Sequence, residues 1–234
     1  MIKDFLLQLV FPRRCPVCDD IVTPFGEKIC LECLKKLQVV TPPWCVKCGK
    51  KLLKEAAFCE DCKKGEHVFQ RGRSLYEYQT VSPCVYRYKY RHRQEYADFF
   101  GEEMVRFLGD FLKRVRPDFL VPVPLHKTRE RQRGYNQALV LAEAISKYSG
   151  IPCKKRVVKR IKATAPMKLL TPLERQNNLK KAFIVCENDV KFKTIMIIDD
   201  IYTTGATMDA LSSLFLEAGA RDVYFVTLSC GASV

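Results

Sequence analysis

The chain has 234 residues, an apolar share of 47% and a formal net charge of +14. This composition is that of a globular protein and excludes wholesale disorder, and no apolar run approaches the roughly 18 residues of a membrane span. The first residues lack the small-residue cleavage site of a signal peptide. We therefore expect a cytoplasmic protein whose residues 2–10 form a short amphipathic helix.

The positive charge is concentrated in the middle of the chain. Residues 1–70 carry a net charge of +3, residues 71–170 carry +13 and residues 171–234 carry −2. This distribution predicts either a local anion-binding region or a water-facing surface rich in Lys and Arg between residues 71 and 170.

Eight of the twelve cysteines form four C-x-x-C pairs, separated by 11, 11 and 10 residues. Two such turns offer four thiolates to one tetrahedral ion, so this spacing predicts two structural zinc sites. Disulfides and an iron–sulfur cluster are the alternatives, and disulfides fit poorly because nothing marks the chain as secreted. The pairs can join in sequence order or in a cross-braced order. The expected ligands are Cys15, Cys18, Cys30, Cys33, Cys45, Cys48, Cys59 and Cys62.

A segment this small buries little core, so bound metal would supply much of its folding energy. We expect residues 1–66 to form this module and residues 67–234 to form a second domain. His67 is expected to be an ordinary surface histidine rather than a reserve ligand, since eight thiolates already complete two sites. The other cysteines are expected to be small buried hydrophobic residues; they are Cys84, Cys153, Cys186 and Cys230.

From residue 67 onward, strand-like and helix-like patterns alternate. Aromatic and polar residues alternate over 67–90, which predicts a strand or hairpin. Apolar spacing predicts helices, and short apolar runs predict strands. The expected helices are 96–115, 135–150 and the part of 203–220 that follows an initial turn. The expected strands are 119–125, 155–161, 182–185, 194–198 and 222–230. This order predicts an α/β fold with a mostly parallel sheet covered on both faces, which binds ligands beyond the carboxyl ends of its strands.

The segment from Tyr86 to Arg93 interleaves tyrosines with cations. Stacking faces beside phosphate-binding cations are typical of sites for single-stranded nucleic acid. The same pattern also describes a strand with tyrosines inside and cations in water. The candidate nucleic-acid contacts are Arg87, Lys89 and Arg91.

The most informative stretch is TIMIIDDIYTTGATM, residues 194–208. An apolar strand ends in the carboxylates Asp199 and Asp200, which can accept hydrogen bonds from sugar hydroxyls. The following residues open a helix, where free N–H groups and threonine hydroxyls can cradle a phosphate. An acidic turn with a threonine N-cap is the plainer alternative. The candidate phosphate-binding residues are Thr203, Thr204, Gly205, Ala206 and Thr207.

This stretch resembles the diphosphoribosyl-binding motif of type I phosphoribosyltransferases. Residues 121–137, VPVPLHKTRERQRGYNQ, resemble the PVPL…RGFNQ signature of the ComF family of competence proteins, with Tyr135 in place of the usual Phe. The cysteine pairs are similar to the double zinc ribbon of that family, and Met167 stands where members usually carry Gln. Further residues fall at the family's spacings: Arg160, Thr164, Leu170, Arg175, Asn178, Ala182 and Phe183.

The resemblance covers nearly the whole chain and implies a type I phosphoribosyltransferase-like domain preceded by a small zinc ribbon module. It implies binding of phosphoribosyl diphosphate with magnesium, with Asp199 and Asp200 orienting the ribose hydroxyls. It also implies that the loop 124–134 grips pyrophosphate, with a solvated basic loop as the alternative. The loop residues for this role are Lys127, Arg129 and Arg133, and His126 is expected to be a spacer rather than a general base.

A flexible loop over residues 159–178 is expected to close over the site and exclude water. Arg160, Lys168 and Arg175 would then reach pyrophosphate, with surface charge as the default alternative.

Three functions fit these features. The first is an enzyme that transfers the ribosyl group of phosphoribosyl diphosphate or hydrolyses the compound. The second, implied by the family resemblance, is a protein that handles single-stranded DNA during natural transformation, with a regulatory or inactive phosphoribosyltransferase site. The third is a metabolite-sensing adaptor that docks other DNA-uptake proteins through the zinc module, which thiolates would make slightly acidic.

Overall fold

The structure is a computed structural model of the whole chain, and it describes residues 11–65, 67–162, 182–187 and 189–231. The expected helix at 2–10, and Lys168 and Arg175 of the expected flexible loop, lie outside the described residues.

A four-stranded sheet forms the centre of the second part of the chain, in the order β1-β6-β5-β2. Its strands are β1 (Gly72–Glu77), β6 (Asp222–Cys230), β5 (Thr194–Tyr202) and β2 (Phe119–Pro122). All neighbouring pairs are parallel. The predicted fold class is therefore confirmed: an α/β domain with a parallel sheet follows a small Cys-rich module.

Both faces of the sheet are buried, because alternate side chains of β5 enter different hydrophobic clusters. Met196 and Ile198 pack in one cluster, and Ile195 and Ile197 pack in the other. All four are fully buried. This explains why the strand has a continuous apolar run rather than an alternating pattern.

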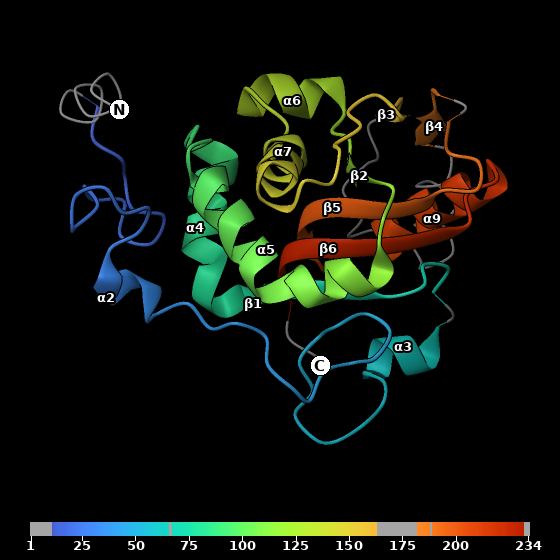
Figure 1. Cartoon of the computed structure of the whole chain (residues 1–234), viewed down its shortest axis with the longest axis horizontal. Helices are drawn as coiled ribbons and strands as arrows, with labels where there is room; N and C mark the ends of the chain where they lie inside the picture. Colours follow the sequence, from blue (N-terminus) through green and yellow to red (C-terminus); the bar gives the residue numbers. More distant parts are fainter. Residues whose placement is uncertain (1–10, 66, 163–181, 188, 232–234) are drawn as a thin grey trace.

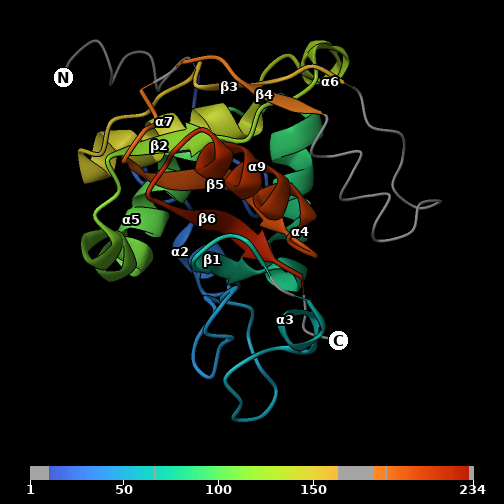
Figure 2. The same cartoon turned by 90° about the vertical axis from the view of Figure 1, so that its right-hand side faces the viewer.

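Helices cover the two faces (Figure 1). Residues of α4 (Tyr78–Tyr90), α5 (Tyr96–Val115) and α7 (Gln137–Ser149) share the cluster of Met196. Residues of α9 (Ala206–Glu217) share the cluster of Ile195 on the other face (Figure 2). Among the helices of the described residues, none combines the length and apolar character that crossing a membrane requires.

The prediction of a strand or hairpin over residues 67–90 is wrong for its second half. The strand β1 ends at Glu77, and α4 follows directly. The tyrosines alternate every second residue, but the buried residues of α4 follow the three- and four-residue spacing of a helix. They are Val81, Cys84, Val85 and Tyr88.

The expected pyrophosphate loop also contains a helix, α6 (Lys127–Arg133). His126 is its N-cap, and the Nδ1 atom accepts a hydrogen bond from the Thr128 backbone N–H at 3.4 Å. Gly134 ends the helix in the left-handed conformation, with φ of 78°. Beyond the main sheet, β3 (Val158–Arg160) and β4 (Phe183–Val185) form a separate antiparallel pair.

The Cys-rich module has two parts, each with one short helix. These helices are α2 (Leu31–Leu34) and α3 (Glu60–Lys64). Cys15 and Cys33 of the first part belong to the cluster of α4, α5 and α7. Cysteines of the second part belong to the cluster that includes α9. The two parts therefore pack into the two different hydrophobic clusters of the sheet.

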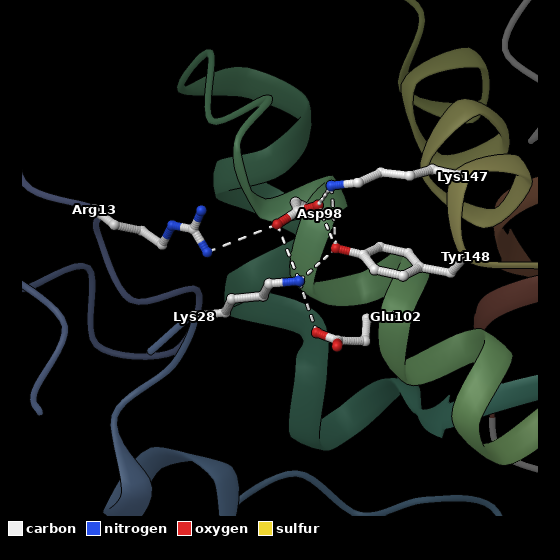
Figure 3. A network of polar contacts seen from close by, with 6 residues as sticks. All are labelled: Arg13, Lys28, Asp98, Glu102, Lys147 and Tyr148. Carbon is white, nitrogen blue, oxygen red and sulfur yellow. Dashed lines mark hydrogen bonds and ion pairs between the residues drawn. The ribbon is translucent and has the colours of Figure 1, made fainter. Parts of the chain in front are cut away.

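A polar network joins the first part of the module to α5 and α7 (Figure 3). Asp98 of α5 accepts hydrogen bonds from Lys147 Nζ at 2.8 Å and from Tyr148 Oη at 2.6 Å. Lys28 Nζ lies 3.1 Å from the other Asp98 oxygen. Burial opposes ionisation of Asp98, but these hydrogen bonds and the Lys28 charge hold its pKa well below the usual value. Arg13 and Glu102 complete the network.

Candidate functional site

The two adjacent carboxylates lie at the carboxyl end of β5, where ligands bind in parallel sheets. The strand continues past them to Tyr202, rather than ending at Ile198 as expected. The Asp200 backbone N–H donates to Asp199 Oδ1 at 2.9 Å. Burial, and then the negative charge of Asp200, raise the pKa of Asp199 to about 7. This carboxyl group therefore exchanges its proton near neutral pH and is sensitive to any cation placed beside it.

Lys89 belongs to this acidic site. Its Nζ atom lies 2.9 Å from Asp200 Oδ1, and the two side chains are only 15% and 10% exposed. Arg87 donates to the backbone oxygens of Pro16 and Val17 in the first part of the Cys-rich module. The alternative of a strand with its cations in water is therefore wrong, because α4 directs Lys89 to Asp200 and Arg87 to the Cys-rich module.

The residues 203–207, called the phosphate loop below, follow β5 and include the first two residues of α9. Together with Asp199 they line a small hollow of about 30 Å³. Gly205 precedes the helix with φ of 86°, a conformation that favours glycine. The first N–H groups of α9 have no acceptor within the helix and can receive an anion. Thr203 and Thr204 are exposed beside them.

Three cations from three different elements, Lys89, Arg133 and Arg160, interact electrostatically with Asp199, and a fourth, Arg129, interacts with Arg160. The charges of Lys89 and Arg133 both act to lower the Asp199 pKa, against the effect of burial. Burial, and then the charge of Arg129, lower the pKa of Arg160, while Asp199 acts in the opposite direction. The structure thus brings together the predicted residues Arg129, Arg133 and Arg160, and adds Lys89. Lys127 is exposed on the first turn of α6.

Arg133 is held in place by its neighbours. It donates to Gln137 Oε1 at 2.8 Å and to Tyr90 Oη at 3.2 Å. Its guanidinium group lies over the Tyr90 ring, 5.0 Å from the ring centroid. These contacts join the C-terminal ends of α4 and α6 beside the acidic pair.

The expectation of a surface position for His67 is wrong. Its side chain is only 8% exposed, and Nδ1 lies 2.8 Å from Asp209 Oδ2 in the first turn of α9. The ring also stacks on Phe69, with 4.7 Å between centroids. His67 and Asp209 are 142 residues apart in the sequence, so no local pattern signals the contact.

The cysteine pairs join in sequence order. Four ligand atoms lie within 4.8 Å of one another in each group. Four sulfur atoms complete the shell of a structural zinc ion, so the residues fit the metal that the spacing predicts. The first cysteine group is Cys15, Cys18, Cys30 and Cys33, and the second cysteine group is Cys45, Cys48, Cys59 and Cys62.

The other four cysteines follow the expectation only in part. Cys84 and Cys230 are buried, and Cys153 is half-buried. Cys186 is exposed, contrary to the expectation, because it follows the end of the short strand β4.

Comparisons with known proteins agree with these features. Residues 6–63 match the family model of the double zinc ribbon domain. The chain is 30% identical over 220 residues to Competence protein F of Haemophilus influenzae, covering 91% of this chain and 95% of that protein. It is 32% identical over 204 residues to Competence protein ComFC of Bacillus subtilis, covering 82% and 80%. It is 28% identical over 222 residues to the DNA utilization protein YhgH of Escherichia coli, covering 92% and 96%.

Among solved structures, the chain is similar to a purine phosphoribosyltransferase from Pyrococcus horikoshii, with a TM-score of 0.36 and 18% identity, covering 56% of this chain and 73% of that one. It is also similar to an allosteric regulatory enzyme of purine biosynthesis, with a TM-score of 0.41 and 16% identity, covering 60% and 29%.

Proposed function

The chain belongs to the ComF family of competence proteins, and from this we propose that it acts in DNA uptake and binds phosphoribosyl diphosphate with magnesium. The observation that carries the proposal is the placement of Asp199 and Asp200 beside the phosphate loop, at the carboxyl end of a central parallel strand. A sugar phosphate needs both kinds of group side by side: N–H and hydroxyl donors for its phosphate, and carboxylates that accept hydrogen bonds from its hydroxyls.

The 5-phosphate of the ligand would bind the phosphate loop, where N–H groups and threonine hydroxyls are available. The two carboxylates would accept hydrogen bonds from the ribose hydroxyls. Arg129, Arg133 and Arg160 would bind the diphosphate, because a guanidinium group donates two hydrogen bonds to phosphate oxygens.

Magnesium suits the oxygen donors of this site. The ligand's diphosphate and ribose oxygens would hold most of its coordination shell. The ion would neutralise part of the diphosphate charge. The pair of Lys89 with Asp200 offsets part of the charge of the two adjacent acids before any ligand binds.

The proposal is tested by titrating the protein with phosphoribosyl diphosphate in a calorimeter, with magnesium and without it. Saturable heat that depends on magnesium is the expected result. No heat at millimolar ligand with magnesium present would overturn the proposal. Release of diphosphate in the same samples would extend the function from binding to catalysis, in which the arginines stabilise the leaving group.

We also propose single-stranded DNA as a second ligand, because of one exposed aromatic pair. Tyr86 and Tyr90 are 56% and 51% exposed, and their ring centroids are 5.2 Å apart. Arg133 contacts Tyr90 beside this pair, and Arg91 follows at the C-cap of α4. Bases can stack on exposed tyrosines while cations bind the backbone.

Replacing both tyrosines by alanine is expected to weaken binding of an oligo(dT) strand about tenfold or more, since each stacked base contributes about 1–3 kcal/mol. Fluorescence anisotropy at several salt concentrations measures this affinity. Tyr78→Ala is the matched control, because Tyr78 is exposed at the other end of the same helix. Equal affinity of the double variant and wild type would contradict the second proposal.

Arg133 lies at the edge of both proposed sites. We therefore expect phosphoribosyl diphosphate to displace part of the bound DNA in a competition experiment.

A further inference from the structure

A buried contact between Asp209 and the segment before β1 holds the first turn of α9, beside the phosphate loop. None of the proposed ligand-binding residues takes part in this contact. Both carboxylate oxygens of Asp209, in the first turn of α9, have partners in the segment that follows the second cysteine group. Oδ2 lies 2.8 Å from His67 Nδ1, and Oδ1 accepts from the Val68 backbone N–H at 2.9 Å. The start of α9 is therefore fastened to residues 67 and 68.

The same histidine fixes the backbone of the phosphate loop. A Cβ atom at Gly205 would lie 2.8 Å from His67 Cε1 and 2.8 Å from Tyr202 Oη. The imidazole and the phenol thus close on the residue whose conformation starts α9. Among the described residues, neither His67 Nε2 nor Tyr202 Oη has a hydrogen-bond partner, although both atoms are buried. Such buried polar atoms are uncommon, and they mark positions where the side chain serves more than packing.

The second cysteine group lies in the same packed region. Its buried members Cys45, Cys48 and Cys59 share one hydrophobic cluster with Phe69 and Tyr202. His67 stacks on Phe69, and Phe69 packs edge-on against Phe225 with 4.8 Å between centroids.

Lys50, two residues after Cys48, links this cysteine group to Tyr202, the residue of β5 that directly precedes the phosphate loop. It is 4% exposed, and its Nζ atom lies 5.6 Å from the Tyr202 ring centroid. The same Nζ atom bonds Asp61 at 2.6 Å, next to Cys62. Cysteines of the first group, by contrast, pack in the other cluster.

We propose that His67 and Asp209 are positioning residues for phosphate binding, and that they couple the phosphate loop to metal in the second cysteine group. Ligand on the loop and metal in this group then stabilise each other, since coupling between two binding sites is reciprocal. The first cysteine group takes no part in this coupling. The inference rests on the proposed binding of a sugar phosphate at the phosphate loop.

The first test compares His67→Ala with His67→Asn by calorimetric titration with phosphoribosyl diphosphate and magnesium. His67→Ala is expected to weaken binding about tenfold, because the first turn of α9 loses the contact between Asp209 and the imidazole. His67→Asn is expected to restore most of the affinity, because the asparagine amide can donate near the position of Nδ1. Asp98→Asn is the matched control: it disturbs the network at the first cysteine group (Figure 3) and should leave the affinity unchanged.

The second test measures zinc retained at equilibrium against the chelator 4-(2-pyridylazo)resorcinol, with and without saturating ribose 5-phosphate. Ribose 5-phosphate is the probe because it needs no magnesium and lacks a diphosphate that would itself bind zinc. In the wild type, the ligand is expected to raise zinc retention severalfold at the second group only. Cys62→Ser and Cys33→Ser identify which group releases its metal.

The ligand effect on zinc should disappear in His67→Ala and return in His67→Asn. A role of His67 in stability alone would lower the unfolding temperature without removing this effect. Equal ligand affinity of His67→Ala and wild type, or equal zinc retention with and without ligand, would overturn the inference and leave the proposed function standing. If the wild type binds neither ligand, the proposed function and the inference both fail.

Discussion

Lys89 shows how strongly the role of a side chain depends on the element that carries it. In an alternating strand it would point into water beside Arg87 and Arg91. In the helix α4 it instead reaches Asp200, and both side chains are largely buried. Breaking a largely buried ion pair leaves an uncompensated charge, which costs about 3 kcal/mol or more. Lys89 is therefore part of the acidic site, because it stabilises the buried Asp200 carboxylate and offsets part of the site's negative charge.

The raised pKa of Asp199 leads to a prediction about pH. Below about pH 7 this carboxyl group becomes protonated and loses an acceptor for ribose hydroxyls and magnesium, so ligand affinity should fall as the pH falls. Lys89→Met removes a charge that lowers this pKa, so the midpoint of the fall should move to higher pH. Lys89→Arg should restore it. Calorimetric titrations between pH 5.5 and 8.5 measure the midpoint.

Lys147→Met is the matched control for that series. Lys147 also pairs with a carboxylate, Asp98, but this pair belongs to the network that joins α5 and α7 to the first part of the Cys-rich module. The account of Lys89 would fail if its methionine variant kept the wild-type midpoint while still folding.

Residues that are neighbours in the sequence were predictable as site residues, and distant partners were not. Asp199, Asp200 and the phosphate loop follow one buried strand, so the order of apolar run, acids and glycine indicates them directly. His67 lies before β1 and Asp209 lies in α9, and the two residues pair with each other only through the tertiary fold. The single sequence carries no signal for that pairing.

At the scale of elements, strong apolar patterns predicted most of the helices and strands that follow the Cys-rich module. The strands β2, β5 and β6 and the helices α5, α7 and α9 lie where buried runs or helical spacing place them. The helix α6 was missed because KTRERQR has no apolar periodicity. It is defined instead by its ends, the N-cap His126 and the left-handed Gly134. Polar caps of this kind are weak signals compared with a buried face.

The turn between β5 and α9 gives a prediction for the phosphate loop. Gly205→Ala places a side chain in the left-handed region, which costs about 1–2 kcal/mol, and brings it against His67 and Tyr202. We expect a lower unfolding temperature and a loss of ligand affinity. Gly109→Ala in α5 is the control, because nothing lies within 4 Å of its added methyl group.

The control should be neutral or slightly stabilising, since alanine is favoured over glycine in a helix. Thermal unfolding and calorimetric titration of both variants check the prediction. A Gly205→Ala variant with wild-type stability and affinity would show that the turn is not constrained as described.

At the scale of the whole molecule, the Cys-rich module and the sheet form joint hydrophobic clusters. Cysteines of the first group pack with α4, α5 and α7, and cysteines of the second group pack with β5 and α9. The two four-cysteine zinc sites were predictable from cysteine spacing, and the double zinc ribbon from the family resemblance. The packing of the module was not predictable, because spacing specifies the ligands of a metal and not the outer surface of the site. A domain boundary between residues 66 and 67 stays a prediction.

Part of the positive charge of residues 71–170 lies near the acidic site at the end of β5. Lys89, Arg133 and Arg160 come from α4, α6 and β3 and interact electrostatically with Asp199, and Arg129 of α6 interacts with Arg160. Cations from three elements around two carboxylates suit a ligand that carries both phosphate groups and a bound cation. This matches the proposed ligand, phosphoribosyl diphosphate with magnesium.

The central claim is that the end of β5 binds this ligand, and one calorimetric comparison tests it most directly. The double variant Asp199→Asn/Asp200→Asn is titrated with phosphoribosyl diphosphate and magnesium beside the wild type. Asp222→Asn is the matched control, because Asp222 begins β6 at the opposite end of the parallel sheet. We predict saturable binding for the wild type and the control, and no measurable binding for the double variant. Equal binding by the double variant and the wild type would contradict the claim.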